Sequence, residues 1–171
     1  KIVDDSVLGS SNFFAKFSHE LSRGFKNIKP DMIIILGDRF EMLAASSIAT
    51  IHNIPICHLH GGEKTEGAID DSIRHAITKL SSIHFVSHKE YRNRVIQMGE
   101  NPSRVHYVGA LGLNSKPAKE YLNKVQLEKL LKIKIRDKNF IVTYHPVTLI
   151  RNTINDIEEI LKSLKYFEKF S

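Results

Sequence analysis

The chain has 171 residues, of which 42% are hydrophobic and 26% are charged, the composition of an ordinary globular protein. No apolar run approaches the roughly 20 residues of a membrane span, and no basic and apolar leader opens the sequence. The single cysteine, Cys57, permits no internal disulfide and suits a reducing compartment. We therefore expect a cytoplasmic protein without a membrane partner.

The net charge of +6 is concentrated between Lys116 and Lys138. Such a run of lysines is able to attract phosphates or nucleic acid. No aromatic or glycine pattern typical of nucleic-acid recognition interleaves it, so a solvated helix face is the better interpretation. We expect no nucleic-acid partner.

The first part of the chain alternates helical patterns with short apolar runs. Ser10, Ser11 and Asn12 offer a cap for the first helix, and Pro30 ends it. The expected elements, in chain order, are helix 13–28, strand 31–36, helix 40–52, strand 54–59, helix 69–80, strand 83–87, helix 88–98 and strand 105–108. This alternation predicts right-handed crossovers and a doubly wound parallel sheet of the α/β class.

A glycine-rich segment, residues 109–113, is expected to be a hinge or an interdomain linker. After it the sequence predicts a Lys-rich helix over about 117–132, a strand over 140–144 and a helix over 153–170. These elements are expected to begin a second α/β unit. Because both ends of the sequence fall where further elements are due, we expect the chain to be a piece of a larger enzyme.

Ionisable side chains follow the two most apolar strands. Asp38 comes directly after strand 31–36, and His60 and Glu63 come after strand 54–59. In an open parallel sheet, ligands bind beyond the carboxyl ends of the strands. These groups are therefore placed for chemistry, although Asp38 is equally suited to cap the helix over 40–52.

Asp70 and Arg74 stand four residues apart on one face of the helix over 69–80. They form either an ordinary helical ion pair or a carboxylate oriented by a guanidinium near a helix N-terminus, where the dipole favours anions. Asp71 and His75 repeat the arrangement one position further on. The spacing alone leaves both interpretations open.

The segment His58-Leu59-His60 puts two imidazoles on one face of a strand, an arrangement that can bind a metal ion. A third or fourth ligand at suitable spacing is missing, so we expect no metal site. The glycine pair Gly61-Gly62 indicates a close backbone approach, to a ligand or in a turn with positive φ. His145 follows a predicted strand, where a lone histidine is more often structural than catalytic.

Four segments together resemble the hydrolysing UDP-N-acetylglucosamine 2-epimerase family, especially its bacterial branch for sialic-acid, legionaminic-acid and capsule biosynthesis. They are Leu36–Glu41, His60–Glu63, Gly67–Leu80 and Tyr144–Thr148. The resemblance implies a glycosyltransferase-B type architecture with two Rossmann-like domains. Residues 1–112 are then the later part of the N-terminal domain, and residues 113–171 begin an incomplete C-terminal nucleotide-binding domain.

The resemblance also implies a reaction. UDP is eliminated from a UDP-2-acetamido sugar, either UDP-N-acetylglucosamine or a 2,4-diacetamido-trideoxy relative, to give a glycal. Water then adds with inversion at C2, and the products are UDP and the free manno-configured sugar. No cofactor or metal is implied, the full-length enzyme is expected to be a homodimer or higher homo-oligomer, and the chain alone is not expected to turn over.

Site residues carry over from the family to matching positions: its acid after glycine to Asp38, its helix acid and arginine to Asp70 and Arg74, and its second-domain histidine to His145. Many relatives have a glutamate where this chain has His60. Either His60 or Glu63 then takes that acid/base role. Two other interpretations stay open: a retaining glycosyltransferase of the same architecture, and a non-catalytic sugar-nucleotide-binding domain.

Overall fold

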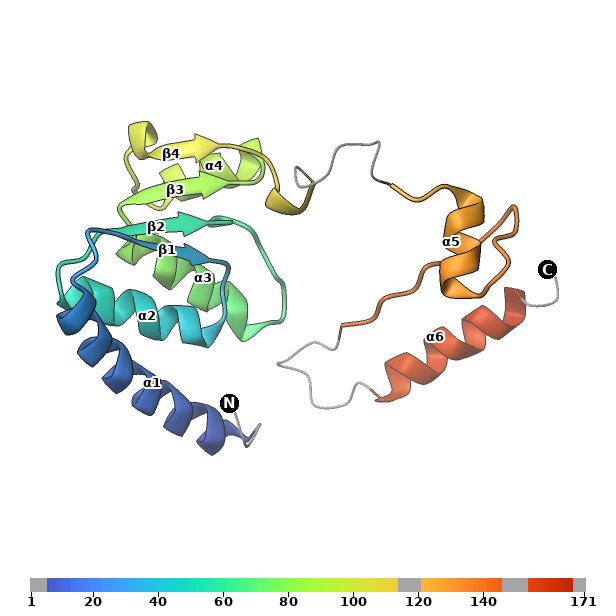
Figure 1. Ribbon diagram of the computed structural model, residues 1–171, viewed down its shortest axis with the longest axis horizontal. Coiled ribbons are helices and arrows are strands. Elements are labelled where there is room, and N and C mark those ends of the chain that lie inside the picture. The colour runs from blue at the N-terminus through green and yellow to red at the C-terminus, as the bar shows by residue number, and fades with distance from the viewer. Residues whose placement is uncertain (1–5, 114–120, 146–153, 168–171) are drawn as a thin grey trace. The chain divides into compact units, whose positions relative to one another are not determined.

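The structure, a computed structural model, describes residues 6–113, 121–145 and 154–167. The chain divides into two compact units, residues 1–113 and residues 114–171. The first unit contains a four-stranded sheet with its helices, and the described part of the second contains two helices (Figure 1). The assignment of these units to the two domains of a glycosyltransferase-B type enzyme stays a prediction.

The strands of the first unit are parallel and follow one another in the order β1-β2-β3-β4. Their bounds are β1 Ile33–Leu36, β2 Ile56–Leu59, β3 Ile83–Val86 and β4 Val105–Tyr107. The parallel α/β fold that the sequence predicts is therefore confirmed. Because the strands add in one direction through right-handed crossovers, the connecting helices lie on one face of the sheet (Figure 1).

The helices of the first unit are α1 Val7–Ile28, α2 Phe40–Ile51, α3 Ile69–Leu80 and α4 Lys89–Gln97. α2 packs between α1 and α3, and α4 packs on β3 and β4. The main core lies between the sheet and α2 and α3, where these elements turn their apolar stripes toward one another. Its buried members are Ile35, Ala49, Ile56, Ile73 and Ile77.

α1 begins earlier than the sequence predicts. Ser6 caps it by accepting a hydrogen bond from the Gly9 N–H at 3.0 Å. Ser11, expected as part of the cap, lies inside the helix and donates its hydroxyl to the Val7 carbonyl. Serine is tolerated there because its hydroxyl can satisfy itself on the preceding turn.

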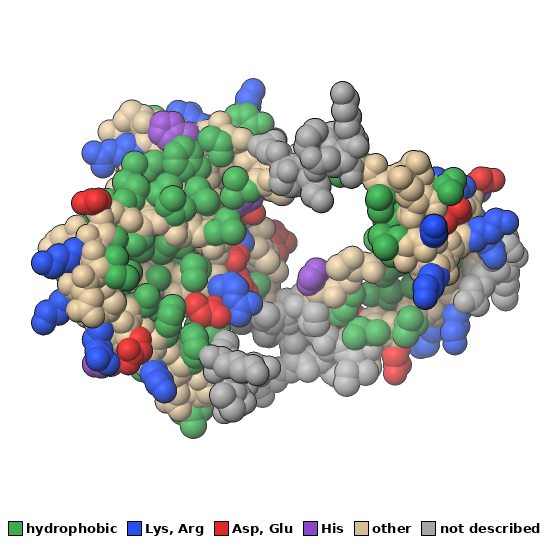
Figure 2. Space-filling model, in the orientation of Figure 1, with side chains coloured by type: hydrophobic (Ala, Val, Ile, Leu, Met, Phe, Trp, Pro, Cys, Tyr) green, Lys and Arg blue, Asp and Glu red, His purple; other side chains and the backbone are tan. Residues whose placement is uncertain are grey.

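The second face of the sheet is open within the described part of the chain. Ile34 is 69% exposed and Leu36 is 55% exposed, whereas Ile35, which points to the helices, is 2% exposed. This difference follows from the two-residue period of a strand. Figure 2 shows hydrophobic side chains gathered over the strands. Parallel sheets are usually covered on both faces, so this surface is unusual for a parallel sheet.

The second unit contains α5, Lys124–Leu131, and α6, Ile154–Phe167. α5 begins with a capping box between Asn123 and Gln126. The strand expected over 140–144 is wrong, because these residues form no ladder in the structure. A strand needs a neighbour to pair with, and the described part of this unit contains no second strand. Residues 117–120, 153 and 168–170 of the expected helices lie outside the described residues.

Two short 3-10 helices complete the described elements, η1 at Pro102–Arg104 and η2 at Leu111–Leu113. η2 occupies the end of the expected linker. In the described ranges no helix combines the length and the apolar character needed to cross a bilayer.

Candidate functional site

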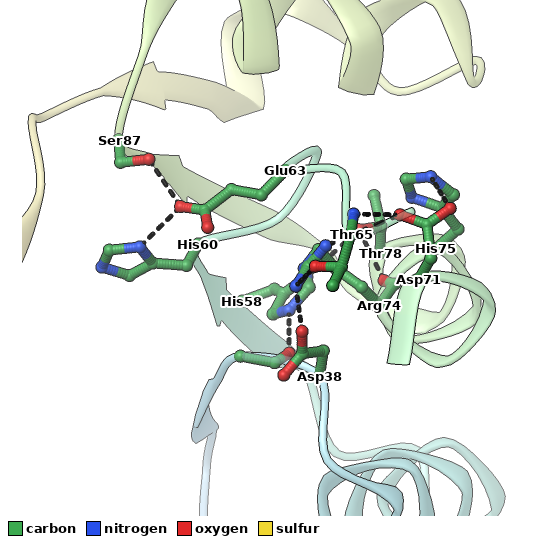
Figure 3. A network of polar contacts seen from close by, with 11 residues as sticks. Asp38, His58, His60, Glu63, Thr65, Asp71, Arg74, His75, Thr78 and Ser87 are labelled. Carbon is green, nitrogen blue, oxygen red and sulfur yellow. Dashed lines mark hydrogen bonds and ion pairs between the residues drawn. The ribbon is translucent and has the colours of Figure 1, made fainter. Parts of the chain in front are cut away.

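Side chains from three segments meet at the carboxyl edge of the sheet, as the sequence predicts. Asp38 follows β1, His60 and Glu63 follow β2, and Arg74 lies in the second turn of α3 (Figure 3). They line a pocket of about 370 Å³ together with Leu36, Gly37, Leu111 and Gly112. The pocket is built entirely within the first unit.

Arg74 is buried, with a side chain that is 6% exposed. Its Nη2 donates to Asp38 Oδ2 and to Thr65 Oγ1, the latter at 3.0 Å, and its Nη1 lies 3.7 Å from Asp71 Oδ1. The Asp38 carboxylate is thus the partner of a buried cation. The N-cap interpretation of Asp38 is wrong, because Arg39 occupies the N-cap position of α2 and makes no side-chain capping bond.

Asp70 is not brought into this group. Among the described residues Asp70 forms no ion pair with Arg74, which turns instead to Asp38 and Asp71. Asp70 lines a neighbouring pocket with Phe40, Ile73 and residues of α1.

Asp71 fastens the loop between β2 and α3. Its Oδ1 accepts a hydrogen bond from the Thr65 N–H at 2.9 Å, and its Oδ2 lies 3.7 Å from His75 Nε2. Because Arg74 also binds the Thr65 hydroxyl, this loop is held to α3 at two points. Asp71 therefore has the structural role that the sequence left open.

His60 and Glu63 form a hydrogen-bonded pair. Glu63 Oε1 accepts from His60 Nδ1 at 2.7 Å and from Ser87 Oγ at 2.6 Å. Burial raises the pKa of Glu63, but the hydrogen bonds from Ser87 and His60 outweigh it, so the pKa lies below the usual value. The carboxylate is therefore ionised at neutral pH, and it accepts the hydrogen bond from the Nδ1–H of His60.

The two imidazoles of His58-Leu59-His60 do not share a face. β2 ends at Leu59, and His60 has a φ of +64°, so the alternation of a strand is broken between them. His58 is buried and bonds to Gly37 and Thr78, whereas His60 bonds to Glu63. Within the described ranges no group of three or more His, Cys, Asp or Glu side chains is arranged to hold a metal ion.

Glycine is required at positions 61 and 62 because other residues of the same chain approach the backbone closely there. A Cβ at Gly61 would lie 2.9 Å from His58 Nδ1, and a Cβ at Gly62 would lie 2.5 Å from the Tyr91 carbonyl oxygen. Gly62 also has a φ of +77°, and its carbonyl accepts a hydrogen bond from Arg94. The close approach expected from the sequence is therefore an approach to β2 and α4.

His145 lies in the second unit, exposed. The hydroxyl of the preceding residue, Tyr144, donates to Asp156 Oδ2 at 2.9 Å and so ties this segment to α6. A part for His145 in the pocket of the first unit stays a prediction.

Sequence reasoning missed Thr65, Thr78 and Ser87 as members of this network. Ser87 directly follows β3, so the rule that identified Asp38 also applies to it. Thr78 follows Arg74 by four residues on the same face of α3. Thr65 lies in a loop, and no pattern in the sequence marks it.

The sequence profile of the family described as UDP-N-acetylglucosamine 2-epimerase matches residues 4–171. The chain belongs to this family. The resemblance predicted from the four segments is confirmed.

Curated relatives of this epimerase family support the same grouping. The chain is 45% identical over 162 residues to the GDP/UDP-N,N'-diacetylbacillosamine 2-epimerase (hydrolyzing) of Campylobacter jejuni, an alignment covering 94% of the chain and 42% of that protein. It is 42% identical over 149 residues to the polysialic acid biosynthesis protein P7 of Escherichia coli, covering 84% of the chain and 37% of that protein. The chain thus spans about two fifths of the length of these relatives.

Solved epimerase structures share the fold. UDP-GlcNAc 2-epimerase from Neisseria meningitidis matches 61% of the chain and 28% of its own length, with a TM-score of 0.55 and 21% identity. The enzyme of the same name from Methanocaldococcus jannaschii matches 63% of the chain and 30% of its own length, with a TM-score of 0.57 and 20% identity. At these identities the likeness concerns the fold.

Proposed function

We propose that the complete protein is a hydrolysing 2-epimerase that acts on a UDP-2-acetamido sugar. The observation that carries this proposal is the pocket at the sheet edge, where a carboxylate, a guanidinium and a carboxylate-bound imidazole face one space. The reaction needs such groups, because a weakly acidic C2 proton must be removed and another delivered. Membership of the epimerase family and the names of the curated relatives support the same activity.

Asp38 is proposed as a proton-transfer residue in this reaction. It removes the C2 proton while the bond between C1 and the UDP oxygen breaks, with the electron pair leaving on UDP to give the glycal. Arg74 orients the carboxylate, because its Nη2 donates a hydrogen bond to Asp38 Oδ2 from a buried position. Water then adds its hydroxyl at C1, and a proton arrives at C2 on the opposite face.

His60, rather than Glu63, is proposed as the second acid/base group. Glu63 is occupied by two hydrogen bonds on one oxygen, whereas His60 Nε2 has no hydrogen bond among the described residues. A histidine whose Nδ1–H is held by a carboxylate can take up and release a proton at Nε2, which is the usual arrangement of a general base. Glu63 orients the ring.

Asp70 and His145 are proposed as site residues because they match site positions of the family. His145 is proposed to contact the diphosphate or the sugar from the second unit, which begins the nucleotide-binding domain. Asp70 lines the neighbouring pocket, one turn of α3 from Arg74. The complete enzyme is proposed to be a homodimer or higher homo-oligomer and to need no cofactor.

The proposal is tested by incubating the complete protein with each candidate UDP-sugar in D2O and without an acceptor sugar. We expect release of UDP and a free sugar with inverted configuration and deuterium at C2, observed by NMR. Transfer only to an added acceptor would indicate a glycosyltransferase, and binding without UDP release would indicate a sensor domain. Comparison of UDP-N-acetylglucosamine with a 2,4-diacetamido-trideoxy relative identifies the substrate.

A further inference from the structure

The described residues contain one buried titratable side chain next to the site that none of these roles uses. His58 lies on β2 and has no exposed surface. Figure 3 shows its ring between the segment of Asp38 and helix α3. Both of its nitrogens have hydrogen-bonding partners, and each partner belongs to a different segment of the site.

The first partner is the turn that carries Asp38. His58 Nε2 donates to the Gly37 carbonyl at 2.9 Å. Gly37 has a φ of +81°, so the chain turns sharply between the end of β1 and Asp38. This hydrogen bond fixes the peptide from which the Asp38 side chain departs.

The second partner is the helix that carries Arg74. His58 Nδ1 lies 3.2 Å from Thr78 Oγ1, and that hydroxyl lies 2.9 Å from the Arg74 carbonyl. Thr78 follows Arg74 by one helical turn. The ring therefore contacts the residue before Asp38 on one side, and on the other side it contacts Thr78, which is hydrogen-bonded to the Arg74 backbone.

One contact fixes the protonation of Nε2. A carbonyl oxygen only accepts, so Nε2 must carry a proton toward Gly37, and Nδ1 faces the Thr78 hydroxyl, whose own proton is donated to the Arg74 carbonyl. Burial lowers the pKa of His58 to about 4, although the hydrogen bond to Gly37 acts in the opposite direction. At neutral pH the ring is uncharged and does not compete with Arg74 for the Asp38 carboxylate.

We propose that His58 is a positioning residue that sets the distance and orientation of the Asp38 carboxylate relative to the Arg74 guanidinium. It does so by binding the Gly37 carbonyl with one nitrogen and Thr78 with the other. The consequence for turnover rests on the proposed epimerase function. The positioning itself is a property of the structure that can be observed without turnover.

The test uses the complete protein with the substitutions His58→Phe, His58→Gln and His84→Phe. Phenylalanine fills the space of the ring without a donor, and the glutamine amide keeps a donor for Gly37. His84 is the matched control, because it is equally buried and lies opposite His58 in the register of β2 and β3. Among the described residues His84 makes no hydrogen bond to either segment of the pair, and its charged neighbour is Glu100.

We expect His58→Phe to lower kcat about 10- to 100-fold, as loss of a residue that orients a functional group typically does, while KM changes less than about threefold. His58→Gln should recover most of the lost kcat, and His84→Phe should retain kcat within about threefold of the unmodified enzyme. Equal losses in His58→Phe and His84→Phe, or full activity in His58→Phe, would overturn the proposal.

Crystal structures of the same variants give the second measurement. In His58→Phe we expect the Gly37 carbonyl to turn and the Asp38 carboxylate to separate from Arg74, with the pair intact in His58→Gln and His84→Phe. If His58→Phe does not fold, Thr78→Val replaces it, because valine keeps the volume and removes the hydroxyl. If the unmodified protein releases no UDP, the epimerase proposal fails and the crystal comparison alone decides on positioning. If the Asp38–Arg74 contact is unchanged in His58→Phe, or in Thr78→Val where that variant replaces it, the inference is refuted.

Discussion

The guanidinium of Arg74 is almost completely buried. Its charge is balanced by the carboxylate of Asp38, which lies 36 residues earlier in the chain. We expect Asp38→Asn to lower kcat of the complete enzyme by at least about 10²-fold, because an amide cannot accept the proton. The variant should also lose stability, because removing one charge of a buried pair leaves the other uncompensated. Steady-state kinetics and thermal unfolding measure the two effects.

Asp31→Asn is the control for this substitution. Asp31 is exposed and precedes β1, at the opposite edge of the sheet from Asp38. We expect kcat and the melting temperature of this variant to equal those of the unmodified protein. Normal turnover in Asp38→Asn would mean that the Asp38 carboxylate only balances the charge of Arg74.

The structure gives Arg74 a different partner from the one that sequence spacing suggests. In a double-mutant cycle on the free energy of unfolding, we expect Asp38→Asn and Arg74→Gln to be strongly non-additive. The cycle of Asp70→Asn with Arg74→Gln should be additive within about 0.5 kcal/mol, because these side chains form no ion pair. Strong coupling in the second cycle and none in the first would contradict the contacts described.

Acid should destabilise the protein through its buried histidines. The pKa of His58 falls from 6.5 to about 4 on burial, so the unfolded chain binds a proton between these pH values and the folded chain does not. Stability is therefore fully present above pH 6.5 and is lost as the pH falls toward 4. Since one pKa unit corresponds to about 1.4 kcal/mol, we expect a loss of about 2 kcal/mol between pH 7.5 and 5.

Urea unfolding at the two pH values measures this loss, and His58→Gln, which cannot titrate, should reduce it. His84 contributes in the same direction, because burial lowers its pKa and the attraction of Glu100 only partly opposes this. An identical pH dependence in His58→Gln would show that His58 does not resist protonation in the folded state.

At the scale of elements, the turn after β2 has no space for a side chain at Gly61 or Gly62. We expect Gly62→Ala to destabilise the protein by more than the roughly 1–2 kcal/mol of a left-handed residue, because its Cβ would also meet the Tyr91 carbonyl. Gly24→Ala in α1 is the matched control. Nothing lies within 4 Å of a Cβ at Gly24, so we expect a gain of about 0.5–1 kcal/mol from helix propensity. Urea unfolding of both variants tests the pair, and a stable Gly62→Ala would contradict this geometry.

Apolar periodicity predicted the helices well, because the residues that define a helix are close together in the sequence. α3 begins and ends at the predicted residues, because its apolar stripe runs from Ile69 to Leu80. The start of α1 was wrong because Ser6 and Ser10 are equally suitable caps by residue type. The strand over 140–144 was wrong because a strand depends on a neighbour that periodicity in one segment does not reveal.

The candidate site divides in the same way. The carboxyl-end rule brought Asp38, His60 and Glu63 together, since it needs only the strands and their order. The partner of Arg74 was assigned to Asp70 because helical spacing is visible in the sequence. The true contact with Asp38 depends on how α3 packs on α2 and β2 beside the segment that follows β1, which no spacing encodes.

At the scale of the whole molecule, the open face of the sheet gives a further prediction. We expect the 171-residue chain to bind a hydrophobic dye such as ANS, because apolar strand residues such as Ile34 face solvent. Ile34→Ala should reduce dye binding and change stability by less than about 1 kcal/mol. Ile35→Ala, the adjacent and buried control, should cost about 2–5 kcal/mol. Fluorescence titration and urea unfolding separate the two variants, and equal costs would mean that the second face is covered.

The strand order has a consequence for how the chain acquires its structure. Each strand pairs with the strand that precedes it in the sequence, so every pairing closes only one helix and its loops. Short closures cost little chain entropy, and a sheet of this order can grow by one strand at a time. During synthesis, β1 and β2 can pair before β3 leaves the ribosome. Each later strand then pairs with the exposed edge of the strand that precedes it.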